Sequence, residues 1–276
     1  MKPNCSHLLC LLIFPALLGI GCKSSSDIPE PLRRLESSNL GVQAQANHEL
    51  TRVDDETKRK YIPFLIRLLD HQEDRVRSSA ASLLGEYGSL AKDAVPGLLE
   101  KLKDPHASVR ESAAFALGNV GLASDAVVNG LLETLVEPSG RINEGVVTSL
   151  GKLGNGGEKV RLALTRIIEE KDDSYVRATA IEGLGGLGEA ARPSLPLLVQ
   201  LLKGPGRGDM RGAAARSLGR LGPIAQEAVP GMAEVMKVKD NFIKSETAKA
   251  LRKIGTPEAM KVLKETGWYD YAVQQK

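Results

Sequence analysis

The stretch VRESAAFALGNVG, residues 109–121, decides the fold of this chain. It is rich in alanine, as good helices are, and it ends in the pattern Leu-Gly-x-x-Gly. The same ending recurs along the chain, with its last glycines 33 or 34 residues apart. A fixed period of this length predicts a solenoid, in which each repeat packs only against its neighbours. The last glycines are Gly88, Gly121, Gly154, Gly188, Gly222 and Gly255.

Apolar residues recur on one face of this stretch. Counted from the first valine, i, they stand at i, i+4, i+8 and i+11, which are Val109, Ala113, Leu117 and Val120. This spacing predicts an amphipathic helix with one buried face. Six copies keep the pattern, and a seventh, which lacks both glycines, stands upstream as an end cap. The seven copies begin at Val42, Val76, Val109, Ile142, Val176, Met210 and Ile243.

A second apolar pattern precedes these helices and contains a proline. It is clearest at Pro63, Pro96, Pro196 and Pro230. Each repeat is therefore predicted to be a helical hairpin, formed by a first helix and a second helix. Proline either opens the first helix or kinks it, and the sequence leaves both possibilities open.

The two glycines of each ending are predicted to have different roles. The last one follows the final apolar residue, where a left-handed residue closes a helix at little cost. The earlier one lies inside the helix, where glycine costs about 1 kcal/mol relative to alanine. We interpret the earlier glycines as points where neighbouring helices approach closely. They are Gly85, Gly118, Gly151, Gly185 and Gly219.

The repeat pattern resembles that of a known family. The helical hairpins, the period, the motif Val-Arg-x-x-Ala-Ala-x-x-Leu-Gly-x-x-Gly and the proline are similar to HEAT repeats of the bilin-lyase-like type. The resemblance covers roughly residues 28–265. It implies an all-α fold, an α-α superhelix (solenoid) of about seven helical hairpins, followed by a C-terminal cap or tail over residues 266–276.

The resemblance also implies a ladder of charges between repeats. In HEAT repeats, the arginine after the first apolar residue of the second helix pairs with an aspartate. Here these arginines are Arg77, Arg110, Arg177 and Arg211. The aspartates close to them in sequence are Asp74, Asp173, Asp209 and Asp240.

The first residues differ in composition from the rest. Residues 1–21 have one lysine, no acidic residue and an apolar run over residues 8–20, which is shorter than a membrane-spanning helix needs. They are predicted to be a lipoprotein signal peptide, because the run ends in Leu18-Gly19-Ile20-Gly21-Cys22 and so resembles a bacterial lipobox. This resemblance implies a lipid on Cys22, a flexible tether over residues 22–27, and a protein of the bacterial cell envelope, lipid-anchored to a membrane and periplasmic or surface-facing. Inner and outer membrane stay open.

The chemistry of the remaining chain is sparse. Without residues 1–21, which hold Cys5 and Cys10, 36 basic residues face 34 acidic ones, a balance that argues against nucleic-acid binding. No cysteine follows Cys22, which excludes disulfides in the repeats. Only one of the histidines, His48, is followed by glutamate, whereas metal-dependent HEAT-repeat hydroxylases use several His-Glu pairs. We therefore expect no metal, no cofactor and no catalytic activity.

One surface suggests a partner. Positions i+3, i+6 and i+10 of the second helices are predicted to form a ridge on the concave side. The ridge is small or mildly polar in the earlier copies, and in the last two it includes Ala213 and Glu246 and becomes basic. Its cations fit an acidic segment of another protein, or they form a solvated face. They are Arg216, Arg220, Lys249 and Lys253.

These observations favour a noncatalytic protein-binding scaffold or adaptor, anchored in the bacterial envelope. Two alternatives stay open at this stage. One is a bilin-lyase-like or other enzyme with a ligand in the concave groove, and the other is a purely structural envelope protein. Trp268, the only tryptophan, either anchors a partner or covers the last repeat, and we favour the cover.

Overall fold

A computed structural model describes residues 28–137, 142–154, 157–170, 173–205 and 208–274. These residues form seven helical hairpins and a last, shorter pair, with an isolated bridge between Val136 and Ile142 and no β-strand among them. The all-α superhelix predicted from the repeats is confirmed. The predicted signal peptide, residues 1–21, and tether, residues 22–27, lie outside the described residues.

The helices alternate along the chain. The first helices are α1 (Glu30–Arg33), α3 (Asp55–Leu68), α5 (Val95–Lys101), α7 (Asp125–Glu133), α9 (Gly157–Glu170), α11 (Leu195–Lys203), α13 (Val229–Val235) and α15 (Pro257–Glu265). The second helices are α2 (Leu40–Thr51), α4 (Asp74–Glu86), α6 (Ala107–Val120), α8 (Glu144–Leu153), α10 (Ser174–Leu184), α12 (Gly208–Leu221), α14 (Asn241–Ile254) and α16 (Tyr269–Gln274). Short 3₁₀ segments are η2 (Arg34–Glu36), η3 (Gly88–Ala94), η4 (Gly188–Ser194) and η5 (Gly222–Ala228).

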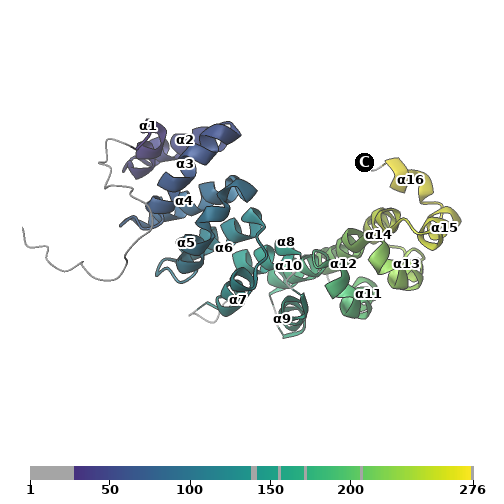
Figure 1. The fold of residues 1–276 in the computed structure, drawn as a ribbon. Helices are drawn as coiled ribbons and strands as arrows, with labels where there is room; N and C mark the ends of the chain where they lie inside the picture. Colours follow the sequence, from purple (N-terminus) through teal and green to yellow (C-terminus); the bar gives the residue numbers. More distant parts are fainter. Residues whose placement is uncertain (1–27, 138–141, 155–156, 171–172, 206–207, 275–276) are drawn as a thin grey trace, which may run out of the picture.

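The hairpins stack into a curved array of two layers. From α4 to α14 the second helices pack against one another on the inner side of the arc, and the first helices form the outer layer (Figure 1). The core between the layers is built from the apolar positions of the repeat: Val109, Ala113, Leu117 and Val120 are all buried. Each repeat therefore buries its apolar face only by stacking on its neighbours.

Polar side chains begin these helices, and glycines end them. Asn39, Asp54, Asn143 and Asp240 each accept a hydrogen bond from a backbone N–H of the first turn that follows. All six glycines predicted to close second helices have positive φ, between 56° and 72°. The left-handed conformation is confirmed at all six, but α10 already ends at Leu184 with Gly185 as its C-cap, so Gly188 does not close that helix.

Proline occurs both in the first turn of a first helix and inside one. Pro63 lies inside α3, whereas Pro96, Pro196 and Pro230 stand in the first turn of α5, α11 and α13. A 3₁₀ segment precedes each of these three helices. Proline costs little there, because a first-turn N–H has no partner within the helix.

The earlier glycines are points of close approach, as predicted. A β-carbon at Gly85 would lie 2.9 Å from Cα of Ala116, and one at Gly118 would lie 2.8 Å from Cα of Ser149. The facing residue always stands two positions before the equivalent position of the next repeat, which is a glycine in four of the five cases and Arg252 in the last, and it is always small. The facing residues of the five glycines are Ala116, Ser149, Gly183, Ser217 and Ala250.

The C-terminal residues cover the end of the stack. α16 packs on α14, and Trp268 and Tyr271 meet edge to face with ring centroids 5.0 Å apart. Both rings are half-buried against the core. Within the described residues no further hairpin follows the last repeat. The aromatic cluster covers the apolar surface at this end.

Candidate functional site

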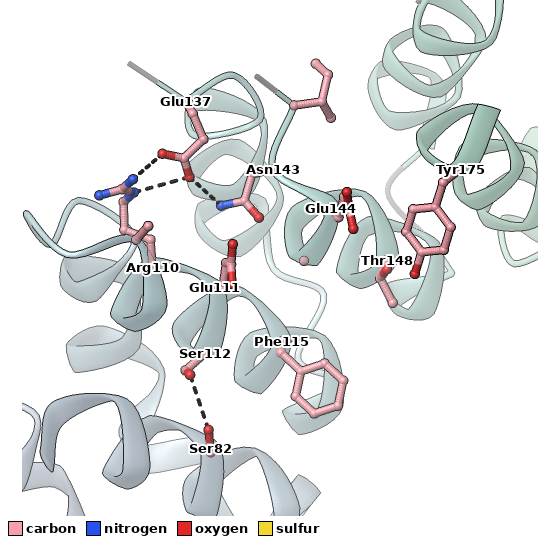
Figure 2. A pocket seen from close by; sticks show the side chains of 13 residues that line it. Ser82, Arg110, Glu111, Ser112, Phe115, Glu137, Asn143, Glu144, Thr148 and Tyr175 are labelled. Atoms are coloured by element: carbon pink, nitrogen blue, oxygen red, sulfur yellow. Dashed lines mark hydrogen bonds and ion pairs between the residues drawn. The ribbon is translucent and has the colours of Figure 1, made fainter. Parts of the chain in front are cut away.

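The inner face of the arc is hollowed between α6 and α8. A cavity of about 750 Å³ lies there, which we call the central cavity. Its 13 lining residues come from α4, α6, α8 and α10 and from the segments on either side of residues 138–141 (Figure 2). The volume is in the range of ordinary ligand pockets.

A hydrogen-bonded set of side chains forms one wall of the central cavity. Arg110 Nε donates to Glu137 at 3.2 Å, and a second guanidinium nitrogen of Arg110 pairs with the other carboxylate oxygen. Asn143 donates to Glu137 at 3.0 Å and accepts from the backbone N–H of Val146, which caps α8 (Figure 2). Because these groups satisfy one another, this wall is rigid and its charges are internally balanced.

The other walls carry unpaired carboxylates and exposed rings. Glu111 on α6 and Glu144 on α8 both stand at position i+2 of their repeats, and neither forms an ion pair with any residue that the structure describes. Phe115 is 37% exposed and Tyr175 is 64% exposed. Lys152 covers part of the Phe115 ring, with Nζ 4.1 Å from its centroid.

A smaller cavity of about 170 Å³ adjoins the central cavity, and we call it the serine cavity. Ser82 lines both. The hydroxyl oxygens of Ser78 and Ser112 lie 2.9 Å apart, and Ser82 donates to Ser112 at 3.2 Å. Hydroxyl groups therefore line the inner face from α4 to α6.

The predicted charge ladder takes its carboxylates from the following repeat. Arg77 donates through Nε to Asp104 at 2.8 Å and through a terminal nitrogen to the other oxygen at 2.9 Å. Arg77 also donates to the carbonyls of His71 and Gln72. Both charged side chains of this pair are almost fully buried, with 8% of each residue exposed.

The ion pair shifts both pKa values. The hydrogen bond to Asp104 raises the pKa of Arg77 despite burial. Burial acts to raise the pKa of Asp104, but the hydrogen bonds from Arg77 and from the backbone N–H of His106 outweigh it and hold this pKa below its usual value. The charged pair is therefore the stable form at neutral pH.

The other ladder arginines have varied partners. Arg110 pairs with Glu137, which lies 27 residues later in the sequence. Asp104 lies at the same distance in sequence from Arg77. Arg211 donates to the carbonyl of Leu202 at 3.0 Å and pairs with Asp240 at 3.3 Å. Arg177 donates to the carbonyl of Ile168.

Of the other aspartates near these arginines in sequence, Asp173 accepts backbone N–H groups of α10, and Asp209 accepts from the N–H of Met210. Asp74 lies in the first turn of α4 and acts on Arg77 only through its charge. The carboxylate partner of Arg77 is Asp104 instead, which the sequence analysis did not identify.

Two of the four cations of the predicted basic ridge are neutralised by glutamates. Arg216 donates to Glu182 at 2.6 Å and pairs with Glu246 at 3.4 Å, and Lys249 pairs with Glu246 at 2.8 Å. Arg220 and Lys253 are exposed. Ala213, which was expected on the ridge, is fully buried, because position i+3 of α12 faces the neighbouring helices.

The described ranges hold neither a metal-binding cluster nor a membrane-spanning helix. No group of three histidine, cysteine or acidic side chains there is placed to hold a metal ion. None of the helices described has the length and apolar character needed to cross a membrane. Cys22 lies outside the described residues.

The fold and the inner face define an α-α solenoid built from stacked helical hairpins. The chain belongs to the HEAT-repeat family: a model of HEAT repeats matches residues 95–185 and 195–272, and a model of the single HEAT repeat matches residues 62–91. No curated protein matches the chain.

Solved structures share this fold. An engineered protein of the Northeast Structural Genomics Consortium is 20% identical with a TM-score of 0.52, over 86% of this chain and 71% of that one. The crystal structure of Kap121p is 16% identical with a TM-score of 0.61, over 80% of this chain. This chain spans only 26% of Kap121p. At such identities the likeness concerns the fold alone.

Proposed function

We propose that this chain is a noncatalytic scaffold of the bacterial envelope, which binds another protein on its inner face and is held on a membrane by a lipid on Cys22. The observation that carries the proposal is the hollowed inner face, where the central cavity and the serine cavity meet at Ser82. An elongated, open surface of this kind suits a polypeptide better than a small substrate that must be enclosed.

The exposed side chains of the inner face support protein binding. Phe115 and Tyr175 present aromatic surface at the central cavity, and aromatic residues are enriched where proteins bind one another. The carboxylates nearest to them, Glu111 and Glu144, give the surface a polar rim. These features lie on second helices, which hold them rigidly within the stack.

Site-specific photo-crosslinking in cells that produce the protein tests the binding surface. A photo-reactive amino acid at Thr148, which lines the central cavity, is expected to give a discrete adduct with one protein. The same amino acid at Leu162, exposed on α9 in the outer layer, is the matched control and is expected to give none. Adducts of equal yield from both positions, or none from either, would contradict a scaffold that works through its inner face.

The lipid anchor has a separate test. Replacing Cys22 with alanine is expected to move the protein from the membrane fraction to the soluble fraction, because each buried methylene of an acyl chain contributes about 0.8 kcal/mol to membrane binding. Cys10→Ala, a change inside the predicted signal peptide, is expected to leave the protein in the membrane fraction. Membrane fractionation with immunoblotting measures both. Retention of the Cys22→Ala protein in the membrane fraction would contradict lipidation at this residue.

A further inference from the structure

The described residues that line the central cavity are acidic on balance. Three of them are glutamates and one is an arginine, which leaves two negative charges among them, and the arginine is already paired with one of the glutamates. The remaining carboxylates, Glu111 and Glu144, are the groups left to meet a charge from outside. A charged partner group bound there would therefore be a cation.

The two carboxylates stand on neighbouring helices that touch. A β-carbon at Gly145 would lie 3.3 Å from the carbonyl oxygen of Glu111, so the start of α8 packs directly on α6 at this point. Glu111 and Glu144 thus stand on either side of this junction, and both line the central cavity (Figure 2). A cationic side chain that enters the cavity is therefore expected to be attracted by both carboxylates.

Aromatic rings complete a site for a long cationic side chain. Tyr175 projects at the α10 side of the central cavity and Phe115 at the α6 side (Figure 2). Lysine and arginine pack their apolar stems against such rings and are attracted to the ring face. Lys152 already occupies this kind of position over Phe115, so the cation of a partner is expected to pack on Tyr175.

The shape of the surface favours a peptide over a small cation. The serine cavity continues the central cavity along the inner face, and it contributes a further exposed carboxylate, Glu86. Hydroxyl and amide groups between these carboxylates, such as those of Ser82 and Asn47, can hydrogen-bond to a peptide backbone. An occupant that reaches from one cavity to the other must be elongated.

We propose that the inner face from α4 to α10 binds a basic segment of the partner protein, with one arginine or lysine side chain in the central cavity between Glu111 and Glu144. This inference rests on the scaffold function proposed above and names the chemistry of the partner. It differs from the acidic partner that the basic ridge suggested, because Glu182 and Glu246 already neutralise Arg216 and Lys249.

Fluorescence anisotropy with the purified full chain tests the proposal. The probes are three labelled ten-residue peptides that differ only in carrying arginine, lysine or glutamate at alternate positions. The arginine peptide is expected to bind most tightly and the glutamate peptide not at all, and added salt is expected to weaken binding. Preferential binding of the glutamate peptide would overturn the proposal and favour the basic ridge.

Paired variants locate the site. Glu111→Gln with Glu144→Gln is expected to weaken binding of the arginine peptide about tenfold. Glu169→Gln with Glu258→Gln makes the same charge change at exposed positions on α9 and α15 and is expected to change binding by less than about twofold. Equal weakening in both double variants would mean that only net charge matters, and the proposed site would be wrong.

The aromatic contribution has its own matched control. Tyr175→Ala is expected to weaken binding about fivefold, as a lost cation–π contact would. Phe242→Ala, at the equivalent position of α14 and 55% exposed, is expected to have no effect.

The two proposals can fail separately. If crosslinks from Thr148 appear in cells while all three peptides fail to bind, the scaffold function is supported and the basic segment is rejected. If the crosslinks are absent as well, both proposals fall.

Discussion

Replacing Gly186 with alanine is expected to lower the free energy of unfolding by about 3 kcal/mol, because the new methyl group has no space. A β-carbon at Gly186 would lie 1.9 Å from the carbonyl oxygen of Gly151 and 3.0 Å from its carbonyl carbon. Both atoms belong to the backbone of α8, so the clash is relieved only if α8 and the turn that follows α10 move apart. The adjacent contact is also tight, since a β-carbon at Gly151 would lie 2.5 Å from Cα of Gly183.

Thermal unfolding followed by circular dichroism at 222 nm measures this effect. A loss of about 3 kcal/mol corresponds to a fall in Tm of roughly 6–12 °C for a chain of this size. Because a solenoid is stabilised by contacts between neighbours, the transition is also expected to broaden as the two halves unfold separately. Gly208→Ala is the control: its β-carbon would lie 3.8 Å from the Phe242 ring, and the change is expected to be neutral or slightly stabilising. A similar, small effect of both substitutions would contradict close packing at Gly186.

The sequence was sufficient for the architecture because the motif with both glycines occurs five times. Glycine is the only residue that suits both a left-handed cap such as Gly121 and a close contact such as Gly118. A motif that contains both glycines therefore predicts the helix ends and the helix contacts together. The prediction did not include the residue that faces each inner glycine. The small residue that faces each inner glycine, for example Ala116 opposite Gly85, was visible in the sequence as a recurring small residue before the leucine.

The first contact between repeats has no small residue, and the missing glycine of the first copy explains this. The first copy has Thr51 where the next five copies have glycine, and the residue two positions before the next glycine is then the bulky Leu83. A small residue is needed only where the preceding repeat supplies a glycine. A comparison of neighbouring copies, and not of each copy alone, would have revealed the contact.

The candidate site was harder to predict, because it arises where the repeats differ. Glu111 and Glu144 stand at position i+2, whereas the sequence analysis considered i+3, i+6 and i+10 for the exposed ridge. Phe115 stands at i+6, which is one of these ridge positions, but its presence in the same cavity as Tyr175 depends on how α6 and α10 are placed. The charge of the basic end was overestimated because its glutamate partners, such as Glu182, come from a neighbouring repeat.

The same limitation affected the ladder. Aspartates near each arginine in sequence were the natural candidates, yet Asp104 and Glu137 lie 27 residues after Arg77 and Arg110. That spacing joins the second helix of one repeat to the loop that follows the first helix of the next. This spacing is set by how neighbouring repeats stack. A search for acidic residues in the following repeat would have found both partners.

Asp104→Asn is expected to lower the free energy of unfolding by about 3 kcal/mol, because it leaves the buried charge of Arg77 without a counter-ion. One carboxylate oxygen becomes an amide NH₂ that faces a donor, since Arg77 donates to both oxygens and the His106 N–H donates to one of them. Burial of Arg77 leaves little water to compensate. Urea unfolding at pH 7 measures the loss.

A matched control and the pH dependence identify the ion pair as the cause. Glu133→Gln makes the same chemical change in the pair Lys103–Glu133, where both side chains are well exposed, and its cost is expected to stay below about 0.5 kcal/mol. The pKa of Asp104 is lower in the folded state than its usual value of 3.8, so the pair stabilises fully above that value and loses its effect as the pH falls through the lowered pKa. The difference in stability between the native chain and Asp104→Asn should therefore be constant from pH 5 to 7 and shrink only below pH 3.8. A difference that stayed the same into strong acid, or a cost as small as that of Glu133→Gln, would mean that the charge of Asp104 does not hold the α4 and α6 repeats together.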